Sequence, residues 1–156
     1  MAQRHKSLIP LSRDHYRGLL LAQQIRADRI MMTGWPADLE GRSRFVARFY
    51  DEHLKIHFAA EEESLFPLVT LHVPQATVLV EELVAEHGRI KDFIARFAKP
   101  DVSTVEKELS DFSEILERHI RKEERRLFPL FENNAPQEIL AQAEEKIQRH
   151  YPSQKR

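Results

Sequence analysis

The sequence predicts an all-α protein, an up-down-up-down four-helix bundle with a short C-terminal fifth helix. Three observations predict this fold class. Apolar residues recur at helical spacing along four long segments, the segments are joined by short connections that contain proline or glycine, and no stretch alternates between apolar and polar residues as a strand would. Four helices of about 20–28 residues with short connections pack best as an antiparallel bundle.

The first segment is expected to begin with an arm over residues 1–11, because Pro10 disfavours helical geometry at the residue before it. Ser12 is a suitable N-cap for the first helix, which is expected to run to about Met32. His15 lies on its inward stripe. The sequence Thr-Gly-Trp-Pro that follows is a stop and a turn.

The second helix is expected to begin between Asp38 and Ser43 and to reach about Leu65. Pro67 lacks a backbone N–H, so we expect the helix to end or kink there. Its inward stripe, read at helical spacing, contains Val46, Phe49, His53, His57 and Glu61.

A third helix is expected from about Pro74 to the turn at Lys99, with His87 halfway along its inward face. Residues 103–106 match a capping box that opens a fourth helix. The inward stripe of the fourth helix contains His119 and Glu123. We expect this helix to end or kink at Pro129, as the second helix does at Pro67.

A short fifth helix is expected to follow the turn at Pro136 and to end at about Arg149. It either caps one end of the bundle or meets a second subunit, so a homodimer remains one of two readings. The tail from Tyr151 onward is expected to be frayed.

One stretch of the chain occurs twice. The sequence HFAAEEESLFPL, residues 57–68, returns 62 positions later as HIRKEERRLFPL, residues 119–130, with seven of the 12 residues identical. Residues four apart lie on one face of a helix, so each copy presents its histidine and the glutamate four residues later together. A single such pair arises by chance, whereas the duplication indicates two matched halves that face one site rather than a repeated amphipathic helix end.

Four histidines and two glutamates are therefore the candidate metal ligands: His15, His57, Glu61, His87, His119 and Glu123. Six ligands are too many for one open tetrahedral zinc but suit two metals. If both carboxylates bridge the pair and each metal takes two imidazoles, each metal has four protein donors. A solvent oxygen bridge makes five, which leaves an octahedral metal one free position. These ligand types suit iron, manganese or zinc.

The composition of the chain excludes several classes of site and of binding partner. The chain has no cysteine, which excludes disulfides, iron–sulfur ligation and cysteine-type zinc sites. The net charge of −1 comes from interleaved charges, without the basic face that nucleic-acid binding needs. No run approaches the apolar length of a membrane span and no secretory signal is visible, so we expect a cytoplasmic protein without a membrane partner. A length of 156 residues fits a single domain over residues 1–156.

The chain resembles the hemerythrin-like (HHE cation-binding) domain, over about residues 8–132, in the order of its donors and in both LFP tails: His15, then His57 and Glu61, then His87, then His119 and Glu123. The resemblance implies a non-haem centre of two iron ions with an oxo or hydroxo bridge, bound by these six residues, with Glu61 and Glu123 bridging. It also implies that the open site meets O2, NO or peroxide. Manganese or zinc in place of iron remains an alternative.

Two departures separate this sequence from the oxygen-carrying hemerythrins. Those proteins have a histidine four residues before the ligand of the third helix, where this chain has Leu83, and their last ligand pair is His-x4-Asp, where this chain has His119 and Glu123. The missing fifth histidine argues against reversible oxygen carriage. Proteins implicated in repair of damaged iron centres also share four histidines and two glutamates, but they usually add an N-terminal segment with cysteine, which this chain lacks.

The leading functional expectation is a di-iron protein that binds or reacts with a small oxidant as a sensor, scavenger or store. An enzyme or iron-centre repair factor is the first alternative, and an iron-handling or interaction module is the second. The sequence identifies neither catalytic residues nor a redox partner.

Several polar residues beside the ligands have open roles. His53 is an extra ligand or a hydrogen-bonded core residue, and its counterpart Ile115 in the repeat favours the second reading. Glu62 and Glu124 are expected to be solvated or bonded to a neighbouring helix, while Glu86 lines the approach to the site, orients a ligand or lies on the surface. Three further histidines fall in expected termini or loops and are expected to be exposed to solvent: His5, His72 and His150.

Overall fold

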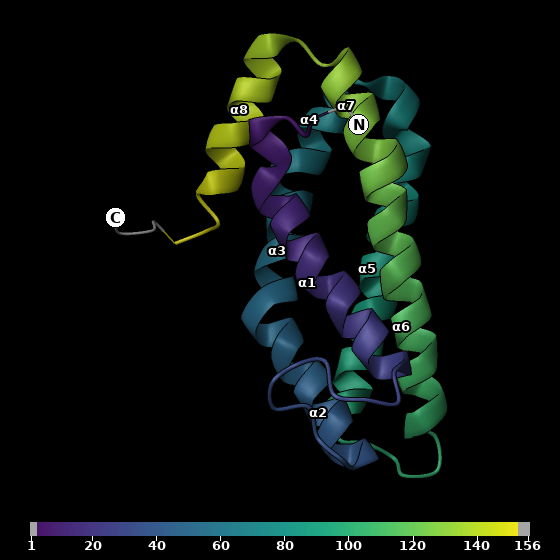
Figure 1. Ribbon diagram of the computed structural model, residues 1–156. Helices are drawn as coiled ribbons and strands as arrows, with labels where there is room; N and C mark the ends of the chain where they lie inside the picture. Colours follow the sequence, from purple (N-terminus) through teal and green to yellow (C-terminus); the bar gives the residue numbers. More distant parts are fainter. Residues whose placement is uncertain (1–2, 153–156) are drawn as a thin grey trace.

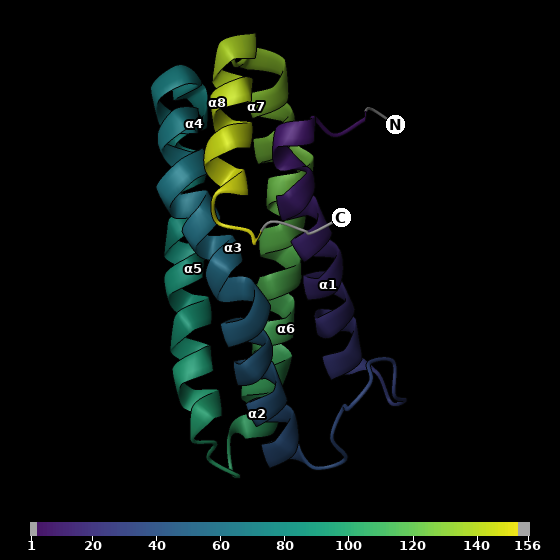
Figure 2. The ribbon, with the colours of Figure 1, turned by 90° about the vertical axis from the view of Figure 1, so that its left-hand side faces the viewer.

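The computed structural model describes residues 3–152 of the chain. Every regular element within them is a helix, and four long helical segments run side by side, alternating in direction along one axis (Figures 1 and 2). The all-α bundle is therefore confirmed. No helix among the described residues is both long and apolar enough to span a membrane.

The four long segments and the fifth helix are built from the following elements. The first segment is α1 (Ile9–Arg26) and the third is α5 (Thr77–Ala98). The second comprises α2 (Leu39–Phe49), the π-helical turn η2 (Tyr50–Leu54), α3 (Lys55–Ala60), the π-helical turn η3 (Glu61–Leu65) and α4 (Phe66–His72). The fourth comprises α6 (Val105–Lys122), the π-helical turn η5 (Glu123–Leu127) and α7 (Phe128–Asn134), and α8 (Gln137–Gln148) is the fifth helix.

The N-terminal part of the chain corrects the predicted arm. A 3₁₀ turn, η1 (Lys6–Leu8), leads directly into α1, whose first turn contains Pro10. Proline is tolerated there because the first N–H groups of a helix have no partner within it. The helix also ends at Arg26 rather than near Met32, because the side-chain oxygen of Gln24 accepts the N–H of Met32 and folds the loop back.

The predicted helix end near Leu65 is wrong, because the second segment stays helical through Pro67 as far as His72. The π turn η3 comes immediately before this proline, and within it the N–H of Phe66 donates to the carbonyl of Glu61, five residues back. The wider π turn accommodates the proline ring in a continuing helix. The fourth segment repeats this arrangement at Pro129.

The predicted capping box at the start of the fourth segment does not form. Thr104 is the N-cap of α6 but makes no capping hydrogen bond, and its hydroxyl donates to Glu108 instead. The hydroxyl and the N–H of Ser103 both donate to the carboxylate of Asp101. Asp101 therefore orders the turn before α6.

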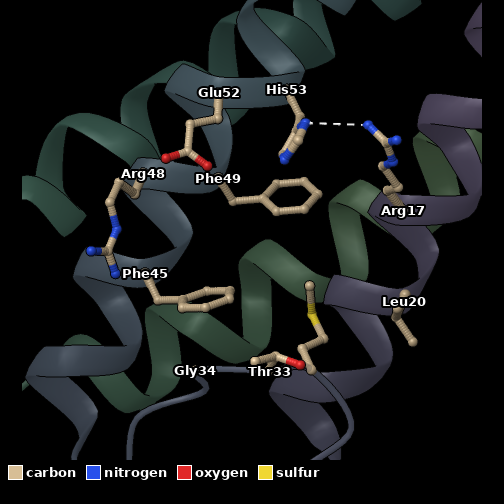
Figure 3. A pocket seen from close by; sticks show the side chains of 10 residues that line it. Arg17, Leu20, Thr33, Gly34, Phe45, Arg48, Phe49, Glu52 and His53 are labelled. Atoms are coloured by element: carbon tan, nitrogen blue, oxygen red, sulfur yellow. Dashed lines mark hydrogen bonds between the residues drawn. The ribbon is translucent and has the colours of Figure 1, made fainter.

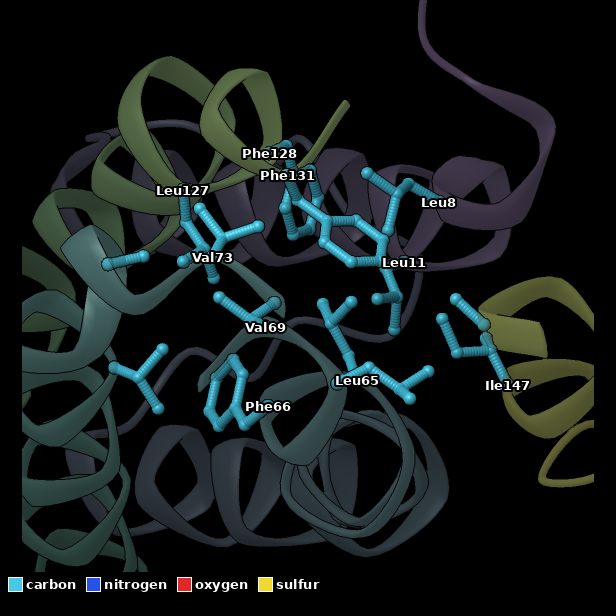
Figure 4. Packing of buried hydrophobic residues seen from close by; sticks show 14 of the residues in the cluster. Leu8, Leu11, Leu65, Phe66, Val69, Val73, Leu127, Phe128, Phe131 and Ile147 are labelled. Carbon is cyan, nitrogen blue, oxygen red and sulfur yellow. The ribbon is translucent and has the colours of Figure 1, made fainter. Parts of the chain in front are cut away.

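The buried apolar residues form two clusters at opposite ends of the bundle. Figure 4 shows the first cluster, in which residues of α4, α7 and the start of the chain pack together with Ile147 of α8. Four apolar side chains of α8 are buried in this cluster: Ile139, Leu140, Ala143 and Ile147. The fifth helix therefore covers one end of the bundle, the first of its two predicted roles.

Candidate metal centre

The six predicted ligands come together in the middle of the bundle, and none is more than 3% exposed. Along α1 and α5, the histidine lies between a residue of the first apolar cluster and a residue of the second. For His87 these residues are Leu83 and Ile90. The site is therefore enclosed by apolar packing at both ends.

The ligand atoms form two groups that share both glutamates. Within each group, atoms able to bind a metal all lie within 4.8 Å of one another. The first group is His15, His57, Glu61 and Glu123, and the second is Glu61, His87, His119 and Glu123.

Each carboxylate lies near one imidazole from each group. Oε1 of Glu61 is 3.2 Å from Nε2 of His57 and 3.2 Å from Nε2 of His87. Oε1 of Glu123 is 2.6 Å from Nε2 of His119 and 3.6 Å from Nε2 of His15. Both glutamates are therefore placed between the two groups, where a bridging ligand would lie.

The local backbone explains how the glutamates reach this position. Both His-x3-Glu pairs end at the first residue of a π turn, Glu61 in η3 and Glu123 in η5. A π turn inserts an extra residue into a helical turn and is frequent at functional sites. The repeat in the sequence is thus also a repeat of backbone geometry.

Five buried atoms at the centre have no hydrogen-bond partner among the described residues: Nε2 of His15 and both carboxylate oxygens of Glu61 and of Glu123. Burying unpaired carboxylate oxygens is costly, so such atoms call for an explanation. A bound cation would satisfy all five, and nitrogen and oxygen donors suit a divalent transition metal. The residues present therefore fit a metal centre.

A second ring of carboxylates orients the imidazoles. The Nδ1 atom of each of the four histidines lies near one carboxylate: His15 with Glu124 at 2.7 Å, His57 with Asp14 at 3.1 Å, His87 with Glu62 at 3.2 Å, and His119 with Glu86 at 2.8 Å. These contacts turn Nε2 of each ring toward the centre. Of the two predicted roles of Glu62 and Glu124, solvation or a bond to a neighbouring helix, the structure shows the bond. Of the readings for Glu86, it supports the orientation of a candidate ligand.

Behind this ring, three carboxylates face cations and one faces a phenol. Glu124 pairs with Arg4, Glu62 with Lys91 and Glu86 with Lys122. Asp14 instead accepts a hydrogen bond from the hydroxyl of Tyr151 at 2.5 Å. The expectation of a frayed tail is thus wrong for Tyr151, while residues 153–156 lie outside the described residues.

Burial and neighbouring charges shift the pKa values of the buried groups in opposite directions. Burial lowers the pKa of His15 and lowers that of His119 to about 4. Burial works against protonation of His57, but the charge of Glu61 and the hydrogen bond with Asp14 raise its pKa to about 10. Burial also disfavours the charged form of Glu61, yet the neighbouring charge of His57 holds its pKa well below the usual value. The centre therefore retains an ionised carboxylate among its imidazoles.

The other histidines lie away from the centre. His53 belongs to neither group of metal-binding atoms, and its ring packs on Phe49, with Nδ1 3.5 Å from Nη1 of Arg17 (Figure 3). It lines a surface pocket rather than the core. The expected exposure of His5, His72 and His150 is wrong, because all three are half-buried.

Sequence reasoning did not identify Asp14 or Tyr151. Asp14 directly precedes a ligand, but no spacing rule distinguishes it from the other acidic residues of the chain. Tyr151 reaches it from 137 positions away, a contact that only the docking of the C-terminal segment creates.

Comparison with known proteins agrees with the geometry. The family model for the hemerythrin HHE cation binding domain matches residues 4–131, a range that contains all six converging side chains. No curated protein matches the chain.

Proposed function

The chain belongs to the hemerythrin HHE cation binding domain family, and from this premise we propose that it holds two iron ions and that the centre binds or reacts with a small oxidant. Family membership and the buried histidine and glutamate groups together indicate cation binding. The number of ions, their identity and the oxidant are the further content of the proposal.

The sharing of both glutamates between the two groups is the observation that carries the proposal. A single ion would use one group and leave the two imidazoles of the other group without an ion. Two ions would use all six side chains: His15 and His57 would hold one, His87 and His119 would hold the other, and Glu61 and Glu123 would serve both. The five unpaired buried atoms would then all be satisfied.

Iron fits the number of donors better than zinc does. Four protein donors complete the usual tetrahedral shell of a structural zinc ion, whereas an octahedral ion retains open positions for a small molecule. When bound, iron would supply an open coordination position and redox chemistry. The protein side chains hold the ions, orient the imidazoles and keep bulk water out.

The surroundings of the imidazoles favour a small and weakly polar ligand. Phe58 stacks on His87 with ring centroids 3.8 Å apart, and Phe66 lies against the same ring at 5.8 Å. Phe128 stacks on His15 at 5.4 Å. Such apolar walls exclude water and admit O2 or NO more readily than a charged ligand. Peroxide, which is uncharged at neutral pH, remains within the same class.

The proposal is tested by loading the metal-free protein with Fe(II) under anaerobic conditions and then admitting O2 or NO. We expect about two iron ions per chain, as four imidazoles and two carboxylates would supply, and new near-ultraviolet absorption after O2 is admitted. Replacing Glu61 and Glu123 together by alanine should abolish both results. Metal content well below two per chain in the unaltered protein, or no spectral change with either gas, would contradict the proposal.

His53→Ala is the matched control for these substitutions. It removes a histidine of the same helical segment that belongs to neither metal-binding group. Parallel loading with Mn(II) and Zn(II) identifies the preferred ion, and tighter retention of zinc with no spectral response would argue against an iron centre.

A further inference from the structure

A second pocket, of about 560 Å³, lies outside the metal centre, between α1, the turn η2, α3 and the end of α8. Its volume falls within the range of ordinary small-molecule sites, about 300–1,000 Å³. Arg13 and Arg17 line one side, Glu52 and Ile56 line another, and Tyr151 belongs to its wall.

Two arginines of the pocket wall lack an ion-pair partner among the described residues, although the wall also contains the carboxylates of Asp14 and Glu52. Arg13 and Arg17 are four residues apart and therefore lie on one face of α1, where like charges repel. Among residues 3–152, neither makes an ion pair with a carboxylate, and the contact of Arg17 with the ring of His53 leaves its charge unpaired. An anion between the two guanidinium groups would relieve the repulsion, and arginine suits a carboxylate because it can donate two parallel hydrogen bonds.

The π turn η2, at this pocket, lies just before the first copy of the repeat and has no equivalent before the second copy. The turns η3 and η5 contain Glu61 and Glu123, but η2 contains none of the six candidate ligands. The corresponding residues of the second copy, 112–116, are regular helix within α6. Because π turns are frequent at functional sites, this unmatched one calls for a role. It brings Glu52 and His53 to the border between this pocket and the neighbouring one drawn in Figure 3.

The pocket also reaches the metal centre through hydrogen bonds. Asp14 and Tyr151 both line it, the Tyr151 hydroxyl donates to Asp14, and Asp14 faces Nδ1 of His57. A ligand in the pocket would therefore touch the hydrogen-bonded pair that orients one metal-binding imidazole. The other three imidazoles are backed by carboxylates paired with cations and have no such neighbour.

We propose that this pocket binds a small organic acid with an apolar body and a hydroxyl group. Its carboxylate lies between Arg13 and Arg17, and its apolar body covers Ile56, a large hydrophobic side chain that is 37% exposed. The hydroxyl donates to the carboxylate of Glu52, which has no ion-pair partner among the described residues. Binding of this acid does not require a metal, so the site stands apart from the proposed function.

The test uses 4-hydroxybenzoate as the probe, titrated calorimetrically into the full chain in metal-free and iron-loaded forms. We expect saturable binding to one site in both forms, weakened about tenfold or more by Arg13→Gln and by Arg17→Gln, since each removes charge-assisted hydrogen bonds. The uncharged probe 4-hydroxybenzamide should bind at least about tenfold more weakly for the same reason.

Arg48→Gln is the matched control. Arg48 is another arginine without an ion pair among the described residues, but it lines the neighbouring pocket and not this one. Equal weakening by Arg48→Gln, unchanged binding in the Arg13 and Arg17 variants, or no saturable binding at millimolar probe would overturn the proposal. Because the metal-free protein is tested alongside, failure here is distinct from failure of iron loading.

Discussion

Removing the Tyr151 hydroxyl tests whether the C-terminal segment supports the metal centre. In Tyr151→Phe the ring remains packed on the first apolar cluster, and only the hydrogen bond to Asp14 is lost. A hydrogen bond to a charged group contributes about 1.5–3 kcal/mol, and the half-buried position places the loss near the lower end, at about 1–2 kcal/mol. For a chain of this length that corresponds to a fall in Tm of about 2–8 °C.

The same substitution should weaken metal binding. Loss of a group that orients a metal-binding histidine typically reduces affinity by about 10–100-fold, and Tyr151 acts one hydrogen bond further out, so we expect about tenfold. Asp14→Asn, which alters the direct partner of His57, should have the larger effect. Both affinities are measured by competition with a chromophoric chelator, and Tm by circular dichroism of the metal-free protein.

Tyr16→Phe is the control for this prediction. Tyr16 is 72% exposed, so loss of its hydroxyl should change the free energy of unfolding by less than about 0.5 kcal/mol. If Tyr151→Phe matched Tyr16→Phe in both Tm and metal affinity, the hydrogen bond to Asp14 would contribute nothing, and the support of His57 by the C-terminal segment would be refuted.

Three further outcomes are expected. Gly88→Ala should raise the free energy of unfolding by about 0.5–1 kcal/mol, since nothing lies within 4 Å of the added methyl. Gly18→Ala should lower it by about 1–3 kcal/mol, because its methyl would lie 2.8 Å from Cδ1 of Ile120. Urea unfolding that ranks the two variants the other way would contradict the packing. Removing metal with a chelator should lower Tm by about 8–16 °C, if free metal had been a thousandfold above its Kd, and equal Tm values with and without metal would show that the ions do not bind the native fold selectively. His53→Ala should retain the metal content of the unaltered protein by elemental analysis, and a lower content would make His53 a ligand.

The repeat made the centre predictable from sequence because its residues are local. A histidine and a glutamate one helical turn apart must share a face, and the same pair in a second helix needs only an antiparallel bundle to meet the first. His15 and His87 were then identified by their place on inward stripes. All six side chains converge as expected.

The wrong predictions came from rules about neighbouring residues that contacts elsewhere in the fold override. Proline was expected to end or kink the second helix, but the segment continues, because the π turn before Pro67 removes the conflict between the ring and the preceding turn. Pro10 was expected to keep the N-terminal arm out of a helix, but within the first helical turn its missing N–H costs nothing. Asp14 and Tyr151 were missed because their contact depends on where α8 docks, which no short-range pattern specifies.

If the two proposed ions bind here, the crossed placement of the glutamates determines when the chain can take them up. Glu61 lies against an imidazole of the third segment, and Glu123 lies against an imidazole of the first. During synthesis, a nascent chain that has emerged only through α4 offers three of the six donors and can complete neither coordination sphere. On the proposed function, ion binding is therefore expected only after the last long helix has docked, so that a tightly bound ion would indicate a fully assembled bundle.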